Sequence, residues 1–420
     1  MKKFKQGTLL KNTIMLYILQ FSTYFLSLIT VPYQTRVLGP VVYGYVGVAL
    51  AVMTYFQLFM DFGFLLSATE DISKNRDDRD YVNRKFTSVT ILKLFLATIS
   101  IAILLVLCFT VPMFAQNKAL YIIYIIAYAI NALLPDYLYR GIEQMTAITV
   151  RTVIIKVFFT VMIFAFLKTE QDYLVMPILL LIGNVAALLG AYIHLYKKLG
   201  YKFTKVSVAE LKEDFKRSLG FFFSRIATTV YSTTNTIIIG LIDKTGVITG
   251  YYTSADKILT TAKNGLSPVS DSLYPYMIKN RDFKLVKKIL LLLMPIIIVG
   301  CVVVGVFSEF ICGLIFGEEF VGTAPVLIAM LPAIVAILPS YILGFPTLGA
   351  MGLSKYANTS IIVGTITHIV GLTLLALSGH LSAVTLAVMT SVSEWSILIF
   401  RAIMVFKNRK IFSEKQDGVE

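Results

Sequence analysis

The residues in this sequence that could do chemistry are charged side chains inside long apolar stretches. Lys257 lies about ten residues, or roughly 15 Å along a helix, beyond the start of its stretch at Val247. A membrane core is about 30 Å thick, so this amine falls near its middle and cannot readily reach either surface. Lys156 and Arg225 lie in similar stretches. All three are candidates for attracting an anionic ligand, although a structural role suits Lys156 equally well and Arg225 could instead extend toward headgroups.

Carboxylates also occur at depth. Asp256 and Glu394 are candidates for binding a proton or a sodium ion. Neighbours at i and i+1 diverge around a helix, so Asp256 need not pair with Lys257 and could pair with a cation of another span. Nearer the inner surface, we expect the amine of Lys93 to extend toward headgroups, and Lys263 suits that role or a cavity-facing one.

Polar side chains recur at helical spacing in three of the apolar stretches, and lipid would tolerate such faces poorly. We therefore expect these three stretches to line an aqueous cavity. The polar faces comprise Thr13, Tyr17, Gln20, Tyr24 and Ser27; Arg225, Thr228, Ser232 and Asn235; and Thr253, Lys257, Thr260, Asn264 and Asp271.

The composition indicates an all-α integral membrane protein. Hydrophobic residues make up 57% of the 420 and charged residues 15%, more apolar surface than a soluble fold of this size could bury. The net charge of +14 comes from residues spread along the chain at the ends of apolar runs, which argues against nucleic-acid binding. Phosphate loops, metal-spaced His or Cys clusters and nucleophile elbows are absent from the sequence. We therefore expect no enzyme, no metal and no cofactor.

A membrane span needs about 20 apolar residues, which predicts about twelve spans around a central cavity. Most of the 38 lysines and arginines, Arg401 among them, then fall in segments on one side, which the positive-inside rule assigns to the cytoplasm together with both termini. The expected spans cover approximately residues 10–35, 41–68, 86–110, 119–140, 146–167, 173–196, 218–241, 247–276, 286–312, 322–348, 356–378 and 381–406.

Two internal echoes predict a duplicated architecture. Gly44-Tyr45 aligns with Gly250-Tyr251, and AINALLPDYL from Ala129 aligns with AIVAILPSYI from Ala333. The offsets agree, so we expect two pseudo-symmetric six-helix lobes. The expected domains are an N-terminal lobe over 1–198, a cytoplasmic linker over 199–217, and a C-terminal lobe with a short tail over 218–420.

The stretch TRVLGPVVYGYVGVA, which turns on Gly39-Pro40 and is followed by DFGF at Asp61, resembles the junction between the first two helices of the bacterial polysaccharide transporter family. That family comprises the O-antigen and capsule repeat-unit flippases. It belongs to a flippase superfamily that also contains multidrug exporters and lipid II flippases. The span count and the two-lobe layout extend the resemblance along the whole chain.

The resemblance implies export of a polyprenyl-diphosphate-linked oligosaccharide from the inner to the outer leaflet of a bacterial cytoplasmic membrane. Alternating access would suit the prolines that crowd the later spans. Lys257, Arg225 and Lys156 would attract the diphosphate, with Arg36 as an outer contact, headgroup anchor or gate. Tyr251 and Tyr252 would stack on sugar, and Asp256 and Glu394 would couple transport to H⁺ or Na⁺.

Expected partners are the undecaprenyl-linked glycan, membrane lipids, and a polysaccharide polymerase and glycosyltransferases, with no nucleic acid. One alternative is a cation-coupled multidrug or small-molecule antiporter of the same fold, which would favour carboxylates in its cavity. Another is a membrane scaffold without transport, for which a buried Lys257 would be unnecessary.

Overall fold

The computed structural model describes residues 6–409, with the side chains of Asn12 and of residues 14–409. Within this part of the chain the structure is helical and contains no strand, which confirms the all-α membrane fold. The chain ends, which we expect in the cytoplasm, and Thr13 of the first polar face lie outside the described residues or side chains.

The chain groups into two compact units, each of which is described by itself. Unit 1 contains residues up to Leu38 together with Tyr45–Ile226, and unit 2 contains Gly39–Gly44 and the residues from Ala227 onward. The division falls inside a helix at Ile226, not in the expected linker over 199–217. The predicted pseudo-symmetry of two lobes stays a prediction.

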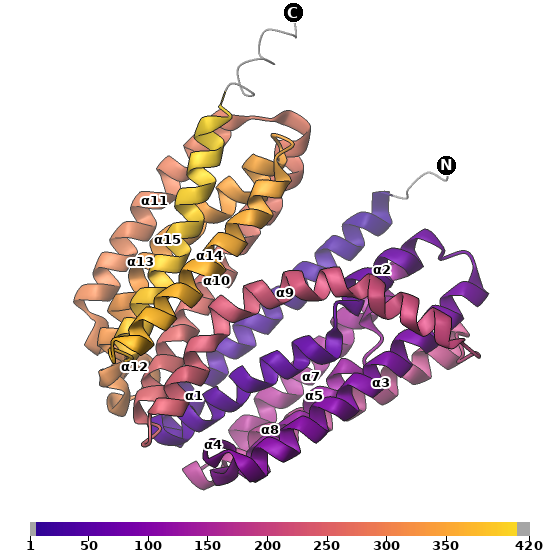
Figure 1. Ribbon diagram of the computed structural model, residues 1–420, viewed down its shortest axis with the longest axis horizontal. Coiled ribbons are helices and arrows are strands. Elements are labelled where there is room, and N and C mark those ends of the chain that lie inside the picture. Colours follow the sequence, from indigo (N-terminus) through magenta and orange to yellow (C-terminus); the bar gives the residue numbers. More distant parts are fainter. Residues whose placement is uncertain (1–5, 410–420) are drawn as a thin grey trace, which may run out of the picture. The chain divides into compact units, whose positions relative to one another are not determined.

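In unit 1, α5 packs against both α3 and α8, and α7 packs against α8 (Figure 1). The helices of this unit are α1 (Gln6–Asp61), α2 (Phe64–Lys74), α3 (Arg79–Thr110), α4 (Pro112–Gln116), α5 (Lys118–Ala132), α6 (Asp136–Gly141), α7 (Met145–Phe166), η1 (Glu170–Leu174), α8 (Val175–His194), η2 (Leu195–Leu199) and the first part of α9 (Val208–Ile242).

In unit 2, α13 and α14 both pack against α15, and α10 and α11 pack against α13 (Figure 1). The helices of this unit are the rest of α9, α10 (Val247–Asn280), α11 (Phe283–Val306), α12 (Ser308–Phe316), η3 (Glu318–Thr323), α13 (Ala324–Ile342), η4 (Leu343–Gly349), α14 (Ser354–Leu377) and α15 (Ala383–Lys407).

Each span expected from the sequence overlaps a helix of the structure. Among the described residues, 9 helical stretches are long and apolar enough to cross a membrane, and the first of them, Ile14–Lys74, continues through the Gly39 turn and so covers two expected spans. The helices α9 and α10 are not among these 9, because they carry the polar faces noted in the sequence. The count of twelve spans stays a prediction.

The turn at Gly39-Pro40 interrupts α1 as expected. Gly39 has φ 65° and ψ 172°, a backbone conformation that glycine adopts without strain. Just after this turn, a Cβ at Gly44 would lie 2.3 Å from the Gly246 carbonyl oxygen. A Cβ at Gly250 would lie 2.1 Å from the Pro40 carbonyl oxygen. The two glycines paired by the sequence echo therefore form one backbone contact inside unit 2.

Buried ion pairs fix the first part of α9 to unit 1. Asp214 accepts from Ser88 at 2.5 Å and forms an ion pair with Lys85, which also lies 3.0 Å from Asp71. Arg217 reaches the other oxygen of Asp71 at 2.6 Å. Residues 208–217, which belong to the expected cytoplasmic linker, are therefore held against α2 and α3.

At the corner between α9 and α10, Asp243 organises the start of α10. Its Oδ2 accepts from the backbone N–H of Thr249 at 2.8 Å, and its Oδ1 accepts from the backbone N–H of Thr245 at 3.0 Å. Both threonine hydroxyls donate to the same carboxylate. Burial opposes ionisation, but these hydrogen bonds outweigh it and hold the pKa of Asp243 below its usual value.

We predict that Gly250→Ala destabilises the protein by about 1–3 kcal/mol, because the added methyl group meets a backbone oxygen that cannot rotate away. The measurement is the melting temperature of the purified protein in detergent. Gly265→Ala is the matched control in the same helix, since a Cβ there has no neighbour within 4 Å. A Gly250→Ala variant as stable as Gly265→Ala would contradict the backbone contact.

We predict that Asp243→Asn lowers the melting temperature at neutral pH and that the difference from wild type shrinks on acidification. A lowered pKa in the folded state stabilises the fold at pH values above the unfolded-state pKa of about 3.9. This contribution is lost as the pH falls through the lower, folded-state pKa. Melting curves of both proteins between neutral and acidic pH measure it; a constant difference would exclude a role for Asp243 ionisation.

Candidate functional site

The polar interior of unit 2 is built around the Asn235 amide on α9. Its Nδ2 lies 3.0 Å from the Tyr252 hydroxyl, 3.0 Å from Thr390 Oγ1 and 3.1 Å from the Leu386 carbonyl oxygen. Its Oδ1 lies 3.1 Å from Nε2 of His368. All these side-chain groups are buried. One amide thus joins α9 to α10, α14 and α15 in the apolar part of the unit.

His368 is held by both ring nitrogens. Because Oδ1 of Asn235 can only accept, Nε2 of His368 carries the proton of that hydrogen bond. Nδ1 lies 2.9 Å from the Ser393 hydroxyl. Neither nitrogen is left to ligate a metal in this arrangement. Groups of three or more His, Cys, Asp or Glu side chains able to hold a metal ion do not occur in the described part of the chain.

Lys263 on α10 and Glu394 on α15 form a buried ion pair with 2.6 Å between Nζ and Oε1. The ammonium also lies 5.7 Å from the centre of the Tyr231 ring. Lys263 therefore does not extend to lipid headgroups in this structure. Glu394, a predicted ion-coupling residue, is occupied by an internal cation.

Asp256 and Lys257 lie side by side in the sequence on α10, and both are half-buried. The ion pairs within 4 Å among the described residues do not include either side chain. Lys257 thus differs from Lys263, whose charge is neutralised inside unit 2. Their predicted roles in substrate attraction and ion coupling stay predictions.

The two tyrosines expected to stack on sugar have different environments. Tyr252 is 2% exposed and its hydroxyl is bonded to Asn235, so it is a core residue and the prediction that it meets sugar does not fit this structure. Tyr251 is half-buried, with its ring 6.3 Å from that of Phe320. A Cβ at Gly322 would lie 2.4 Å from this ring, so one face of Tyr251 is covered by η3.

Three predicted site residues lie in unit 1. Arg36 is exposed on α1, and Arg225 is half-buried near the end of the part of α9 that belongs to this unit. Lys156 is half-buried on α7 and lines a cavity of about 270 Å³. The predicted site residues are therefore divided between the two units. On the polar faces, Thr228, Ser232, Thr260 and Asp271 are exposed, whereas Asn235 is not.

We expect Arg401 in a cytoplasmic segment, but in the structure it lies within a helix. It is buried on α15, where Nη1 donates to the Ser340 carbonyl oxygen at 2.6 Å and Nε donates to Ser360 Oγ at 2.8 Å. A Cβ at Gly344 would lie 2.9 Å from the same guanidinium. Gly344 has the non-helical ψ of −122° that interrupts η4. The apolar run ILIF directly before Arg401 was the available signal for its depth.

The position of Lys93 also differs from the expectation. Its amine does not extend to headgroups but is buried in unit 1, where it donates to the Ala132 carbonyl oxygen at 2.8 Å. It lies 3.3 Å from Asp61 and 5.4 Å from the centre of the Tyr137 ring. Lys93 therefore satisfies the last carbonyl of α5, just before the break at Pro135.

Comparison with known proteins gives a consistent family. The sequence signature of the family described as "Polysaccharide biosynthesis protein" matches residues 9–281. A "Putative O-antigen transporter" of Escherichia coli K12 is 28% identical over 286 residues, which cover 68% of each chain. A protein of the same name from Shigella dysenteriae is 26% identical over 365 residues, covering 86% of this chain and 91% of that protein.

Two solved structures share the fold at low sequence identity. The lipid II flippase MurJ in an inward closed conformation has a TM-score of 0.74 at 15% identity, covering 96% of this chain and 90% of MurJ. A multidrug resistance MATE family transporter of the MOP superfamily, in an inward-facing conformation, has a TM-score of 0.64 at 13% identity, with 96% and 99% covered. The relatives are named as transporters, which confirms that the chain is not an enzyme.

We predict that Lys263→Met lowers stability by about 3–5 kcal/mol, because it leaves the Glu394 carboxylate buried without its cation. The double variant Lys263→Met with Glu394→Met should be less destabilised than Lys263→Met alone, since neither charge is then left unpaired. Thermal unfolding in detergent measures both. Lys284→Met, which removes an exposed lysine, is the control. A double variant no more stable than Lys263→Met alone would contradict the ion pair.

Proposed function

Because the chain belongs to the polysaccharide biosynthesis protein family, we propose that it is a flippase for polyprenyl-diphosphate-linked oligosaccharide repeat units. It moves them from the inner to the outer leaflet of the bacterial cytoplasmic membrane by alternating access. The relatives named as O-antigen transporters and the fold shared with a lipid II flippase support this proposal. The observation that carries it is the charge of Lys257, which lies on α10, a helix that we propose to span the membrane, and which forms no ion pair within 4 Å among the described residues.

Lys257 attracts the diphosphate of the carrier lipid. A diphosphate is strongly anionic, and an ammonium held in a poorly solvated place forms short, charge-assisted hydrogen bonds with phosphate oxygens. The polyprenyl tail can remain in lipid while the polar headgroup crosses. Arg225 and Lys156 add positive charge in unit 1, and Arg36 serves as an outer contact. The half-buried ring of Tyr251 is the aromatic side chain that we propose to contact sugar. Tyr252 no longer belongs to this proposal, because it is a core residue.

Asp256 is the better of the two predicted coupling groups. Glu394 is neutralised by Lys263, so binding a proton or a sodium ion there would first require that ion pair to open. Among the described residues Asp256 forms no such ion pair, and it is adjacent to Lys257 in the sequence. Binding of H⁺ or Na⁺ at Asp256 would change the charge beside the ammonium, and with it the affinity for the diphosphate.

The proposed topology places both termini in the cytoplasm, where the lysine and arginine bias puts them. The substrate would come from glycosyltransferases on that side and pass to a polymerase on the other. A cation-coupled drug antiporter is the alternative on the same fold. Such an antiporter depends on unneutralised carboxylates in its cavity, and the ion pair with Lys263 already neutralises Glu394, one of the two carboxylates predicted to couple transport.

We predict that Lys257→Ala folds normally but lowers glycolipid translocation about tenfold or more, the effect of losing one charge-assisted hydrogen bond. Lys257→Arg, which keeps the charge, should retain part of the activity. The measurement is surface polysaccharide, together with undecaprenyl-linked glycan accumulating inside, in a strain that depends on the variant.

Lys287→Ala, which removes an exposed lysine on α11, is the matched control. Normal surface polysaccharide with Lys257→Ala would exclude the proposed role of Lys257. Drug resistance conferred by the wild-type chain, without any effect on polysaccharide, would favour the antiporter.

A further inference from the structure

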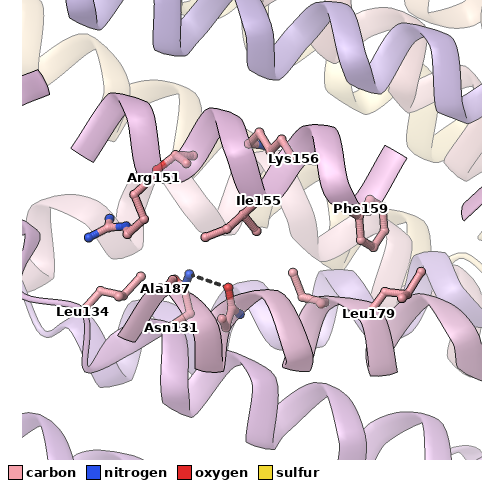
Figure 2. A pocket seen from close by; sticks show the side chains of 11 residues that line it. Asn131, Leu134, Arg151, Ile155, Lys156, Phe159, Leu179 and Ala187 are labelled. Atoms are coloured by element: carbon pink, nitrogen blue, oxygen red, sulfur yellow. Dashed lines mark hydrogen bonds between the residues drawn. The ribbon is translucent and has the colours of Figure 1, made fainter. Parts of the chain in front are cut away.

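A cavity of about 270 Å³ in unit 1 has no role in the predicted transport step beyond the presence of Lys156 at its wall. It lies between α7 and the helices α5 and α8. Figure 2 shows Arg151, Ile155 and Phe159 of α7 on one side, with Leu134, Leu179 and Asn131 on the other. The hydrogen bond of 3.4 Å from Asn131 to Asn184 crosses its floor.

Arg151 gives this cavity an unmet hydrogen-bonding requirement. Its Nη2 lies 2.6 Å from Oδ1 of Asp136, which anchors the side chain to α6. Its Nη1 is buried and has no hydrogen-bond partner in the described part of the chain. A buried charged donor without an acceptor costs more than a neutral one, so this nitrogen calls for an acceptor supplied by a ligand. An anionic oxygen is the acceptor that a guanidinium binds best.

The rest of the cavity suits a different chemistry. From Arg151 the wall continues along α7 through Ile155 to Phe159, a distance of about 12 Å for a helix. Leu134, Leu179 and Leu180 line the facing side. A small hydrated anion would leave these apolar side chains without contacts, whereas a hydrocarbon chain would fill the space. The cavity therefore matches a molecule with an anionic group at one end and an apolar chain behind it.

The position of Arg151 in the first half of α7 sets the direction in which a bound lipid would lie. Arg151 follows the start of α7 at Met145 by six residues, or about 9 Å, while the whole helix of 22 residues is about 33 Å long. A phosphate at Arg151 would thus lie toward one membrane surface, with its chain directed toward the membrane centre.

We infer that this cavity binds a phosphate-bearing lipid, with a phosphate oxygen accepting from Nη1 of Arg151 and an apolar chain lying along Ile155 and Phe159. The lipid could be an anionic phospholipid of the membrane or a polyprenyl phosphate, because both present this chemistry. Binding at this site does not depend on the proposed transport, so the two can be tested separately.

The test is lipid binding by the purified full chain in a neutral detergent, followed by native mass spectrometry and by the melting temperature. Phosphatidylglycerol and undecaprenyl phosphate are the two lipid probes, and diacylglycerol and inorganic phosphate are the controls for chain and anion alone. Leu180→Trp fills the cavity without touching the ion pair of Arg151. Ile178→Trp is its matched control, since Ile178 is 41% exposed on the same helix and does not line the cavity.

We expect wild type and Ile178→Trp to retain a phosphate-bearing lipid through delipidation. Leu180→Trp should bind this lipid about tenfold more weakly. Arg151→Gln should lose a similar amount of affinity, because it removes the charge-assisted hydrogen bond. The stronger of the two lipid probes identifies the source. Equal binding by Leu180→Trp and Ile178→Trp would overturn the site. If diacylglycerol stabilises the protein as much as the phosphate-bearing lipids do, the phosphate has no role in binding. If inorganic phosphate stabilises it as much, the apolar chain has no role. If Arg151→Gln fails to fold, Leu180→Trp still decides.

Discussion

Inside a membrane every backbone carbonyl that a broken helix frees must find a donor within the protein, and this constraint explains the placement of two buried cations. Lys93 donates to the last carbonyl of α5, and Arg401 donates to the Ser340 carbonyl beside the broken segment η4. Both satisfy breaks in helices that pack at the centre of their units. Since these two cations already have structural partners, we do not count them among the candidates for binding substrate.

Unit 2 has many polar side chains in its interior, and most of them form hydrogen bonds or ion pairs with one another. Asn235 joins four helices, and the Lys263 and Glu394 side chains neutralise one another between α10 and α15. Satisfied networks of this kind specify one packing of the helices around them. Such a framework holds α10 in a defined rotation about its axis, which is what determines the direction of Asp256 and Lys257. The directions of Asp256 and Lys257 thus depend on hydrogen bonds and an ion pair deeper in the unit.

The sequence predicted the helices well because apolar length is a strong signal, and it placed the Gly39-Pro40 turn because glycine and proline have few alternative uses. The echo of Gly44 in Gly250 predicted a duplication, and the structure shows in addition that the segments around the two glycines are in contact, which the echo did not predict. The surroundings of individual side chains were harder to predict. Tyr251 and Tyr252 are adjacent, yet one is half-buried and one is in the core, since their directions follow from helix rotation. Arg401 was misassigned because lysines and arginines near span ends normally mark the cytoplasmic surface.

Residues Gly39–Gly44 belong by their contacts to unit 2, although the chain on both sides of them belongs to unit 1. Their partners around Gly250 are made about 200 residues later, on the order of 10 to 40 s of translation at roughly 5–20 residues per second. During that interval residues 39–44 lack the contacts that the segment around Gly250 later provides. Unit 2 is therefore completed only when its later residues pack against a segment that was synthesised much earlier. The order of synthesis is thus part of how this protein folds.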